Sequence, residues 1–339
     1  MPGGRRLDGG REGSARRRDG LSRCQQHVSA GTACCSEPRS LYAERFGPRD
    51  PRATVRGGFL ILENLRSREV FADLAALDES VFPLDRAALA IALEEYPHLN
   101  IESYLSKLDT LAARVEVLLG DDRSPLNVLE ALNEVLFIQE GLRGNTEDYY
   151  DPRNSFLNAV LETKNGIPIS LSVIYLEVAR RINFDLKGVG FPSHFIVKYS
   201  SPEREILVDP FNLGRFLTKE DCQELLDRVY GGSMQMQPIF LQAMEKKGIV
   251  SRMLYNLKGI YYQKEEQQKA LNVVEQILLL NPGTLSEIRD RGLLYMQTSL
   301  FAKALADLEF YLSHAPAPEG RSYIEGHIKT LHSIVSCPN

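Results

Sequence analysis

The chain has 339 residues, of which 43% are hydrophobic and 25% are charged. These proportions are typical of a globular protein, and the length is sufficient for more than one folded unit. A membrane-spanning helix needs about eighteen consecutive apolar residues, and no stretch of this sequence provides them. The sequence therefore predicts neither a transmembrane segment nor a membrane partner.

The net charge of −5 is distributed unevenly along the chain. Residues 1–57 contain twelve Arg, no Lys and six acidic residues, a balance of +6, so residues 58–339 sum to −11. An acidic folded part argues against nucleic acid as the main partner. The first 57 residues are rich in Gly and Arg and have little hydrophobic periodicity, which predicts a disordered extension.

The five cysteines form no familiar pattern. Three of them, Cys24, Cys34 and Cys35, lie in the extension, and Cys222 and Cys337 stand alone. Their spacing fits neither a zinc site nor a disulfide framework, and the sequence contains no P-loop, dinucleotide-binding or calcium-binding motif. We therefore expect no metal and no cofactor. Since no signal peptide is recognisable, we also expect a protein of the reducing cytoplasm.

Helical patterns dominate residues 58–142. Apolar residues recur there every three or four positions, and Ser124 followed by Pro125 predicts a helix that begins with a capping serine. We expect that helix to end near Gly144. A polar, aromatic segment follows, and residues 169–181 then predict one very apolar helix.

Residues 190–212 contain two apolar runs that predict an antiparallel β-hairpin. We set the register by loop length, with a loop from Ser200 to Glu203. Residue 198 then pairs with 205, 196 with 207, and 194 with 209.

The two faces of this hairpin differ in character. Side chains alternate along a strand, so one face is continuously apolar and consists of Phe195, Val197, Tyr199, Ile206 and Val208. The other face pairs Lys198 with Glu205 and brings His194 beside Asp209. A carboxylate beside a histidine holds the ring in one tautomer and stabilises its charged form, as in hydrolytic triads. The spacing also fits a structural hydrogen bond at the end of a hairpin, so both interpretations stay open.

The C-terminal part contains an internal repeat. Three residue types recur 34 positions apart, namely Tyr261 and Tyr295, Ala270 and Ala304, and Pro282 and Pro316. This is the period of a tetratricopeptide repeat, in which a small alanine lets two antiparallel helices approach closely and proline ends the second helix. We predict two repeats, at about 251–284 and 285–318, followed by a capping helix at 320–335. Arg291 is unusual for a packed position in the second repeat.

The segments "DYYDPRNSFLNAVLETKNGIPISLSVIYLEVARR", "GFPSHF" and "VDPFN" resemble the SirB/YchA-like branch of the transglutaminase-like, papain-related superfamily. The resemblance covers roughly residues 60 to 335. It implies an α+β transglutaminase-like core over residues 58–232, with a helical N-terminal part and an antiparallel sheet. It also implies an all-α tetratricopeptide-repeat segment over residues 233–339.

The resemblance also implies a site. Its catalytic pattern has Cys at the start of a helix, His on the following strand and Asp on the next one. His194 and Asp209 match this pattern, but the cysteine position falls on Pro168, and no cysteine lies between positions 35 and 222. Ser170 lies two residues further on and could act as a nucleophile, although a serine there also fits an N-cap role.

A polar segment before this helix is a candidate wall of the same groove. Its members are Tyr149, Tyr150, Asn154 and Asn158, and Pro168 would complete the groove. The same residues also suit turn and cap contacts, so both roles stay open.

The missing cysteine favours a non-catalytic role in protein–protein interaction or regulation, through the groove and the repeats. The alternative is a hydrolase or acyl transferase that acts on amide bonds, using His194 and Asp209 with a nucleophile other than cysteine. We expect protein or peptide partners in either case.

Overall fold

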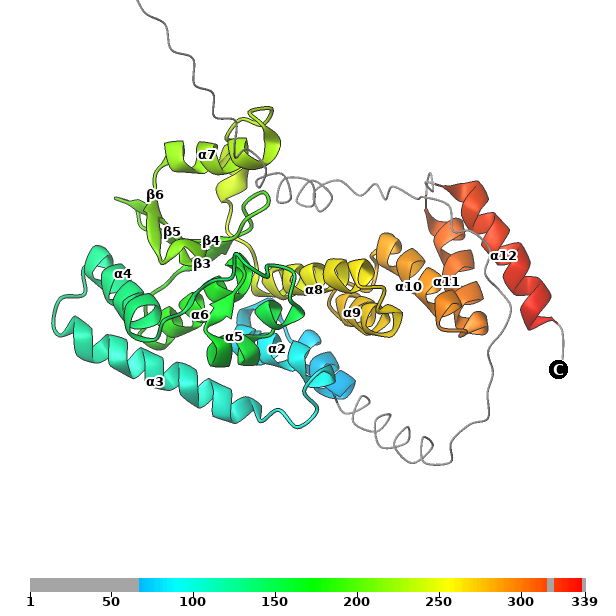
Figure 1. Cartoon of the computed structure of the whole chain (residues 1–339), viewed down its shortest axis with the longest axis horizontal. Coiled ribbons are helices and arrows are strands. Elements are labelled where there is room, and N and C mark those ends of the chain that lie inside the picture. Colours follow the sequence, from blue (N-terminus) through cyan, green and yellow to red (C-terminus); the bar gives the residue numbers. More distant parts are fainter. Residues whose placement is uncertain (1–66, 316–319, 337–339) are drawn as a thin grey trace, which may run out of the picture.

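The computed structural model describes residues 67–315 and 320–336 (Figure 1). The predicted disordered extension at 1–57 and the predicted helix-ending Pro316 lie outside the described residues. Within 67–315 and 320–336, no helix has the length and apolar character needed to cross a membrane.

The N-terminal part of the described chain is helical, as predicted. Residues 67–75 form a helix. Three further α-helices follow, namely α2 (Leu84–Ala90), α3 (Ile101–Leu119) and α4 (Pro125–Asn133). Helix α4 begins at Pro125 after Ser124, as expected, but it continues into a π-helix, Glu134–Gln139, and not as regular helix towards Gly144.

The centre of this part is the buried helix α6 (Pro168–Arg181), preceded by α5 (Leu157–Thr163). A four-stranded antiparallel sheet has the order β3-β4-β5-β6, made of Lys187–Val189, Ile196–Ser200, Glu205–Asp209 and Arg215–Leu217. Two short strands, β1 (Arg143–Gly144) and β2 (Asn165–Gly166), pair in parallel ahead of α6. In Figure 1 the sheet lies between α6 and α7 (Lys219–Tyr230).

The predicted hairpin exists, but its predicted register is wrong by two residues. Residue 198 pairs with 207 and not with 205. The backbones of Ser201 and Arg204 are hydrogen-bonded to each other beyond the ends of the two strands. The loop between them therefore contains only two residues, Pro202 and Glu203. A slip of two residues keeps every side chain on its predicted face, because side chains alternate with a period of two.

Both faces of the hairpin are therefore used for packing. Phe195, Val197 and Val208 are buried in the main core, as predicted for the apolar face. The other face packs on a second cluster that includes Cys222 and Leu226 of α7. Lys198 and Glu205 do form an ion pair, at 3.3 Å, although they are diagonal neighbours.

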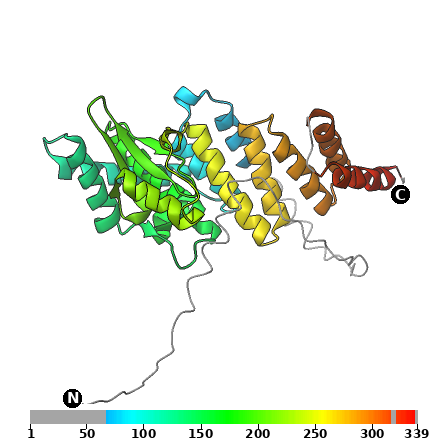
Figure 2. The ribbon, with the colours of Figure 1, turned by 90° about the horizontal axis from the view of Figure 1, so that it is seen from above.

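The C-terminal helices confirm the predicted repeat. They are α8 (Lys246–Gln263), α9 (Gln267–Leu280), α10 (Leu285–Gln297), α11 (Phe301–His314) and α12 (Arg321–Val335), and they extend in a row from the rest of the protein (Figure 2). Ala270 and Ala304 are fully buried between paired helices. Glu265 and Ser299, also 34 residues apart, both turn the chain with positive φ angles of 55° and 62°. Arg291, the unusual residue, is accounted for by its ion pair with Asp307 at 2.7 Å.

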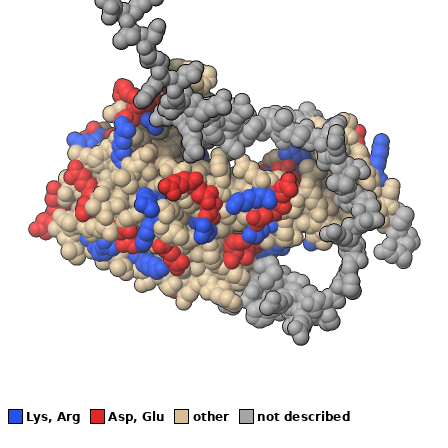
Figure 3. Space-filling view, viewed as in Figure 1, with Lys and Arg blue, Asp and Glu red and all other residues tan. Residues whose placement is uncertain are grey.

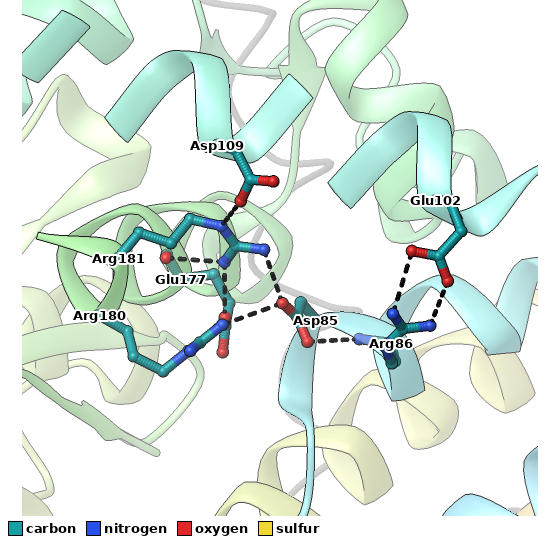
Figure 4. Close-up of polar contacts among 7 residues, drawn as sticks. All are labelled: Asp85, Arg86, Glu102, Asp109, Glu177, Arg180 and Arg181. Atoms are coloured by element: carbon teal, nitrogen blue, oxygen red, sulfur yellow. Dashed lines mark hydrogen bonds and ion pairs between the residues drawn. The ribbon is translucent and has the colours of Figure 1, made fainter. Parts of the chain in front are cut away.

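An ion network fixes the C-terminal end of α6 (Figure 4). Arg180 and Arg181 both contact Asp85 Oδ2 on α2, at 3.1 and 2.7 Å, and both also contact Glu177 Oε2. Arg181 reaches Asp109 on α3 as well, at 2.6 Å. Burial raises the pKa of Asp85, but hydrogen bonds and charge from the arginines outweigh it, so the pKa lies below its ordinary value. The network thus joins three helices, since Arg181 of α6 contacts Asp85 on α2 and Asp109 on α3.

Asp85→Asn should lower the free energy of unfolding by about 3 kcal/mol at pH 7, because it removes one of the two buried carboxylates that the two arginines share and leaves only Glu177. A carboxylate with a lowered pKa stabilises the fold above its unfolded pKa, and this contribution is lost as the pH falls through the folded pKa. The difference between wild type and variant in urea unfolding should therefore shrink below about pH 4.

Glu102→Gln is the matched control, because it breaks the exposed ion pair of Glu102 with Arg86 beside the same network. It should cost less than about 1 kcal/mol. Equal losses for the two variants would contradict the role assigned to Asp85.

Candidate functional site

His194 and Asp209 lie together, as the sequence suggested. Nε2 of His194 is 2.9 Å from Oδ1 of Asp209, and the two side chains are 13% and 1% exposed. The N–H of the ring does not point straight at that oxygen, so the contact is close but not a linear hydrogen bond. His194 lies in a turn just before β4, and not within a strand as expected.

The carboxylate of Asp209 is held by the chain that follows it. Oδ1 accepts from the backbone N–H of Phe211 at 3.1 Å, and Oδ2 accepts from the side chain of Asn212 at 2.7 Å. Burial raises the pKa of Asp209, but the contact with His194 and the bonds from Asn212 lower it by a larger amount. The pKa of Asp209 therefore lies below its ordinary value. Asp209 is therefore an anion beside the ring of His194.

Asn133 holds the loop after Asp209 in place through hydrogen bonds. Its side-chain amide donates to the carbonyl of Gly214 at 2.9 Å and accepts at Oδ1 from the buried hydroxyl of Tyr175 at 3.0 Å. Gly214 has a φ of +74°, and a Cβ there would lie 1.9 Å from Asn133 Oδ1. Only glycine fits this position.

The turn that carries His194 is held by Arg252 of α8. Nη2 of Arg252 donates to the carbonyls of Phe191 and His194, at 2.9 and 2.6 Å. Within the described residues no carboxylate forms an ion pair with Arg252. Burial lowers the pKa of this guanidinium from its ordinary value, yet an arginine side chain stays charged in proteins. Sequence reasoning missed Arg252, which the repeat pattern leaves as an ordinary surface position.

Helix α6 begins at Pro168, one residue earlier than predicted, and Ser170 is not its N-cap residue. The Ser170 hydroxyl accepts from the N–H of Ile167 at 3.0 Å and lies 2.6 Å from the carbonyl of Asn154, to which it donates. A Cβ at Gly166 would lie 2.9 Å from this oxygen, so the hydroxyl is tightly enclosed. It is fully buried and its hydrogen-bonding capacity is used, which leaves it no proton to give to His194.

The cysteine that follows Asp209 in the sequence is no substitute. Cys222 is fully buried in α7. Burial, with the acidic residues nearby, raises its pKa to about 11. A thiol in this state is unreactive.

A cavity of about 130 Å³ lies at the start of α6. From the transglutaminase-like part it is lined by Tyr149, Tyr150, Ile167, Pro168, His194 and Phe195, among others. From α8 it is lined by Arg252, Tyr255, Asn256, Gly259, Ile260 and Gln263. The structure thus brings Tyr149, Tyr150, Pro168 and His194 to one cavity, which Ser170 does not line.

Asn154 and Asn158, expected to line the same groove, do not line this cavity. Both are buried, at 3% and 2% exposure. The Asn154 amide donates to the carbonyl of Asp148 at 2.7 Å and accepts from Asn145, so it holds the preceding turn together. Asn158 Oδ1 is buried with no hydrogen-bond partner among the described residues.

Comparisons with known proteins agree with this architecture. The family model of the transglutaminase-like superfamily matches residues 102–255, and a tetratricopeptide-repeat model matches residues 257–327. These matches confirm the predicted superfamily and the predicted repeats. The branch within the superfamily stays a prediction.

Several curated relatives are UPF0162 proteins. The protein from Xylella fastidiosa strain Temecula1 is 36% identical over 266 residues, which cover 76% of this chain and 93% of that protein. The protein from Vibrio cholerae is 29% identical over 255 residues, which cover 75% and 94%. The protein from Pseudomonas aeruginosa is 30% identical over 226 residues, which cover 67% and 82%. No solved structure matches the chain.

Ser170→Ala should lower the free energy of unfolding by about 1–3 kcal/mol, because it leaves the Ile167 N–H and the Asn154 carbonyl buried without their partner. Ser172 is the matched control on the same helix, since its buried hydroxyl has no partner among the described residues. Ser172→Ala should be neutral or slightly stabilising in the same urea titration. The opposite order of the two variants would contradict a structural role for Ser170.

Pro168→Cys should create a reactive thiol, because the new side chain would face the cavity beside His194 at a helix N-terminus. We expect alkylation by iodoacetamide at pH 6 to be about tenfold or more faster than for an ordinary thiol. Cys24, Cys34, Cys35 and Cys337 would first be replaced by Ser, and buried Cys222 would be kept.

Gln267→Cys is the matched control for this thiol. It places a thiol at the first position of the exposed start of α9, where no histidine is adjacent. Adding His194→Ala to Pro168→Cys should bring its pH profile close to that of the Gln267→Cys thiol. Identical profiles for Pro168→Cys with and without His194 would show that the histidine does not face position 168.

Proposed function

This chain belongs to the UPF0162 family and joins a transglutaminase-like domain to tetratricopeptide repeats, and we propose that it binds protein or peptide segments without breaking or exchanging amide bonds. One observation carries the proposal. Pro168 stands in the cavity beside His194 at the position where the superfamily pattern has its cysteine.

The two possible replacements support the same reading. The hydroxyl of Ser170 is buried and engaged in hydrogen bonds, and the thiol of Cys222 is buried in another element. His194 and Asp209 then keep a base without a nucleophile for it to activate. We propose that their present role is to shape and polarise the cavity.

The composition of the cavity supports binding of a peptide. Its walls are aromatic and aliphatic, with a few polar groups, which is the usual make-up of a site that recognises organic ligands. Tyr255, on α8, lines this cavity and is 37% exposed. Tyrosine supplies a large contact area at low conformational cost, so it suits a recognition surface.

The charge distribution supports a protein partner over a polyanion. On the face shown in Figure 3, Lys and Arg side chains alternate with Asp and Glu and leave wide uncharged areas between them. Nucleic acids are held by continuous basic surfaces that neutralise several phosphates. We propose that the protein acts in the cytoplasm, the compartment predicted from its cysteine spacing.

Incubation with casein and a fluorescent primary amine tests the absence of catalysis. Wild type and His194→Ala should both give background labelling, with a known transglutaminase as positive control. Labelling by wild type that disappears in His194→Ala would overturn the proposal and establish the alternative, an acyl transferase that uses His194 and Asp209.

Peptide binding is tested with an immobilised library of random octapeptides and the full chain. Wild type should retain a subset of the peptides, and Tyr255→Ala should bind these about tenfold more weakly, because it removes an aromatic contact from the cavity. No retention above a protein-free control would overturn the binding role.

A further inference from the structure

We propose that the cavity beside His194 takes the C-terminal end of a polypeptide, and that Arg252 binds its free carboxylate. This inference rests on the proposed function and names the class of ligand for the same cavity. It is carried by the charge of the cavity, by the unused donors of Arg252 and by the shape of the α8 wall.

The cavity contains a permanent cation and no anion. None of its fourteen described lining residues is Asp or Glu, whereas Arg252 and His194 both line it. Buried charges are normally paired, because an isolated charge in a protein interior loses the solvation that it has in water. Within the described residues Arg252 contacts two backbone carbonyls and the ring of Phe195, at 5.7 Å, and none of these carries a negative charge. An anionic group entering the cavity would therefore supply the missing countercharge.

Arg252 has the correct donors for a carboxylate. Its two hydrogen bonds to backbone carbonyls both come from Nη2, so Nη1 and Nε keep their N–H groups for a ligand. Because both N–H groups of Nη2 are engaged, no parallel pair of N–H groups is left, and each carboxylate oxygen would accept a single charge-assisted bond from Nε or from Nη1. One arginine balances one carboxylate, whereas a phosphate dianion needs more than one cation. The bonds to Phe191 and His194 also fix the guanidinium in advance, which reduces the entropy cost of binding.

The α8 wall fits an extended chain. The residues that α8 contributes run from Arg252 to Gln263 at intervals of three and four, along one side of the helix. These positions are eleven steps of 1.5 Å apart and span about 16 Å, which is the length of several extended residues. A compact small molecule would not need a site of this length.

The position of Arg252 within this wall favours a chain end. Arg252 is the first α8 residue of the stripe, and the turn that it holds, at Phe191 and His194, closes that end. A chain lying along α8 would meet the cation at its terminus and not in its middle. Ile167 and Phe195 line the same cavity, and Phe195 lies against Arg252, so we expect an apolar final side chain.

Two octapeptide libraries test the proposal, identical except that one has free C-terminal carboxylates and the other C-terminal amides. The full chain is exposed to both, and retained peptides are resynthesised in each form for fluorescence anisotropy. Wild type should bind the carboxylate form about ten- to a hundredfold more tightly, as expected for a charge-assisted contact. Arg252→Gln should lose this preference. Arg252→Lys keeps a positive charge without the guanidinium group, and it should show an intermediate preference.

Two further variants separate the anchor from general effects. Tyr255→Ala should weaken both peptide forms by a similar factor and keep the preference for the carboxylate. Arg321→Gln removes an exposed arginine of α12 and should behave as wild type. Thermal unfolding of Arg252→Gln shows whether the variant still folds, and Arg252→Lys carries the test if it does not.

The outcomes distinguish this inference from the proposed function. Equal binding of the two forms by wild type would overturn the carboxylate anchor and leave peptide binding intact. Retention of amidated peptides rich in Asp or Glu would overturn the C-terminal assignment. A preference that persists in both Arg252 variants would show that another group binds the carboxylate. Retention of neither library would overturn both proposals.

Discussion

The burial of α6 is the constraint on which the rest of the structure depends. Every residue from Pro168 to Ala179 is buried, so the start of the helix cannot leave its backbone N–H groups to water. At the N-terminal end, proline removes one unpaired N–H and Ser170 satisfies another. At the C-terminal end, Arg180 and Arg181 find their partners in the carboxylates of Asp85 and Glu177.

This constraint also explains how the helix start can remain stable without a catalytic residue. Proline at the first helical position is locally favourable, because its fixed φ suits the helix and its missing N–H would have had no partner there. A cysteine at this position would give up that advantage in return for reactivity. The buried carboxylate of Asp209 stays useful in either case, because it accepts from Phe211 and Asn212 and so holds its own loop. Retention of His194 and Asp209 is therefore compatible with both structural and catalytic roles.

The sequence predicted the pairing of His194 with Asp209 although the register was wrong, and the reason is geometric. A slip of two residues preserves the face of each side chain, whereas a slip of one would have separated the pair. The repeats were predictable because a period of 34 residues is imposed by local helix geometry. The partners of Ser170 and the lock of Asn133 on Gly214 were not predictable, since they join segments whose approach depends on tertiary packing. The contact of Arg252 with His194 was not predictable for the same reason, because the two residues are 58 positions apart in the sequence and Arg252 lies on α8.

Helix α8 links the transglutaminase-like part of the chain to the tetratricopeptide repeats. One side of it carries Met253, Leu254 and Leu257 into the main core, and another side forms the α8 wall of the cavity. A ligand along this wall would therefore contact the transglutaminase-like part and the first repeat at the same time. The cavity needs both α8, which supplies the cation, and the preceding part, which supplies the turn and most of the aromatic walls. Arg252 lies within the transglutaminase-like match, 102–255, and Gly259 and Gln263 lie within the repeat match, 257–327, so the α8 wall crosses the boundary between the two family models.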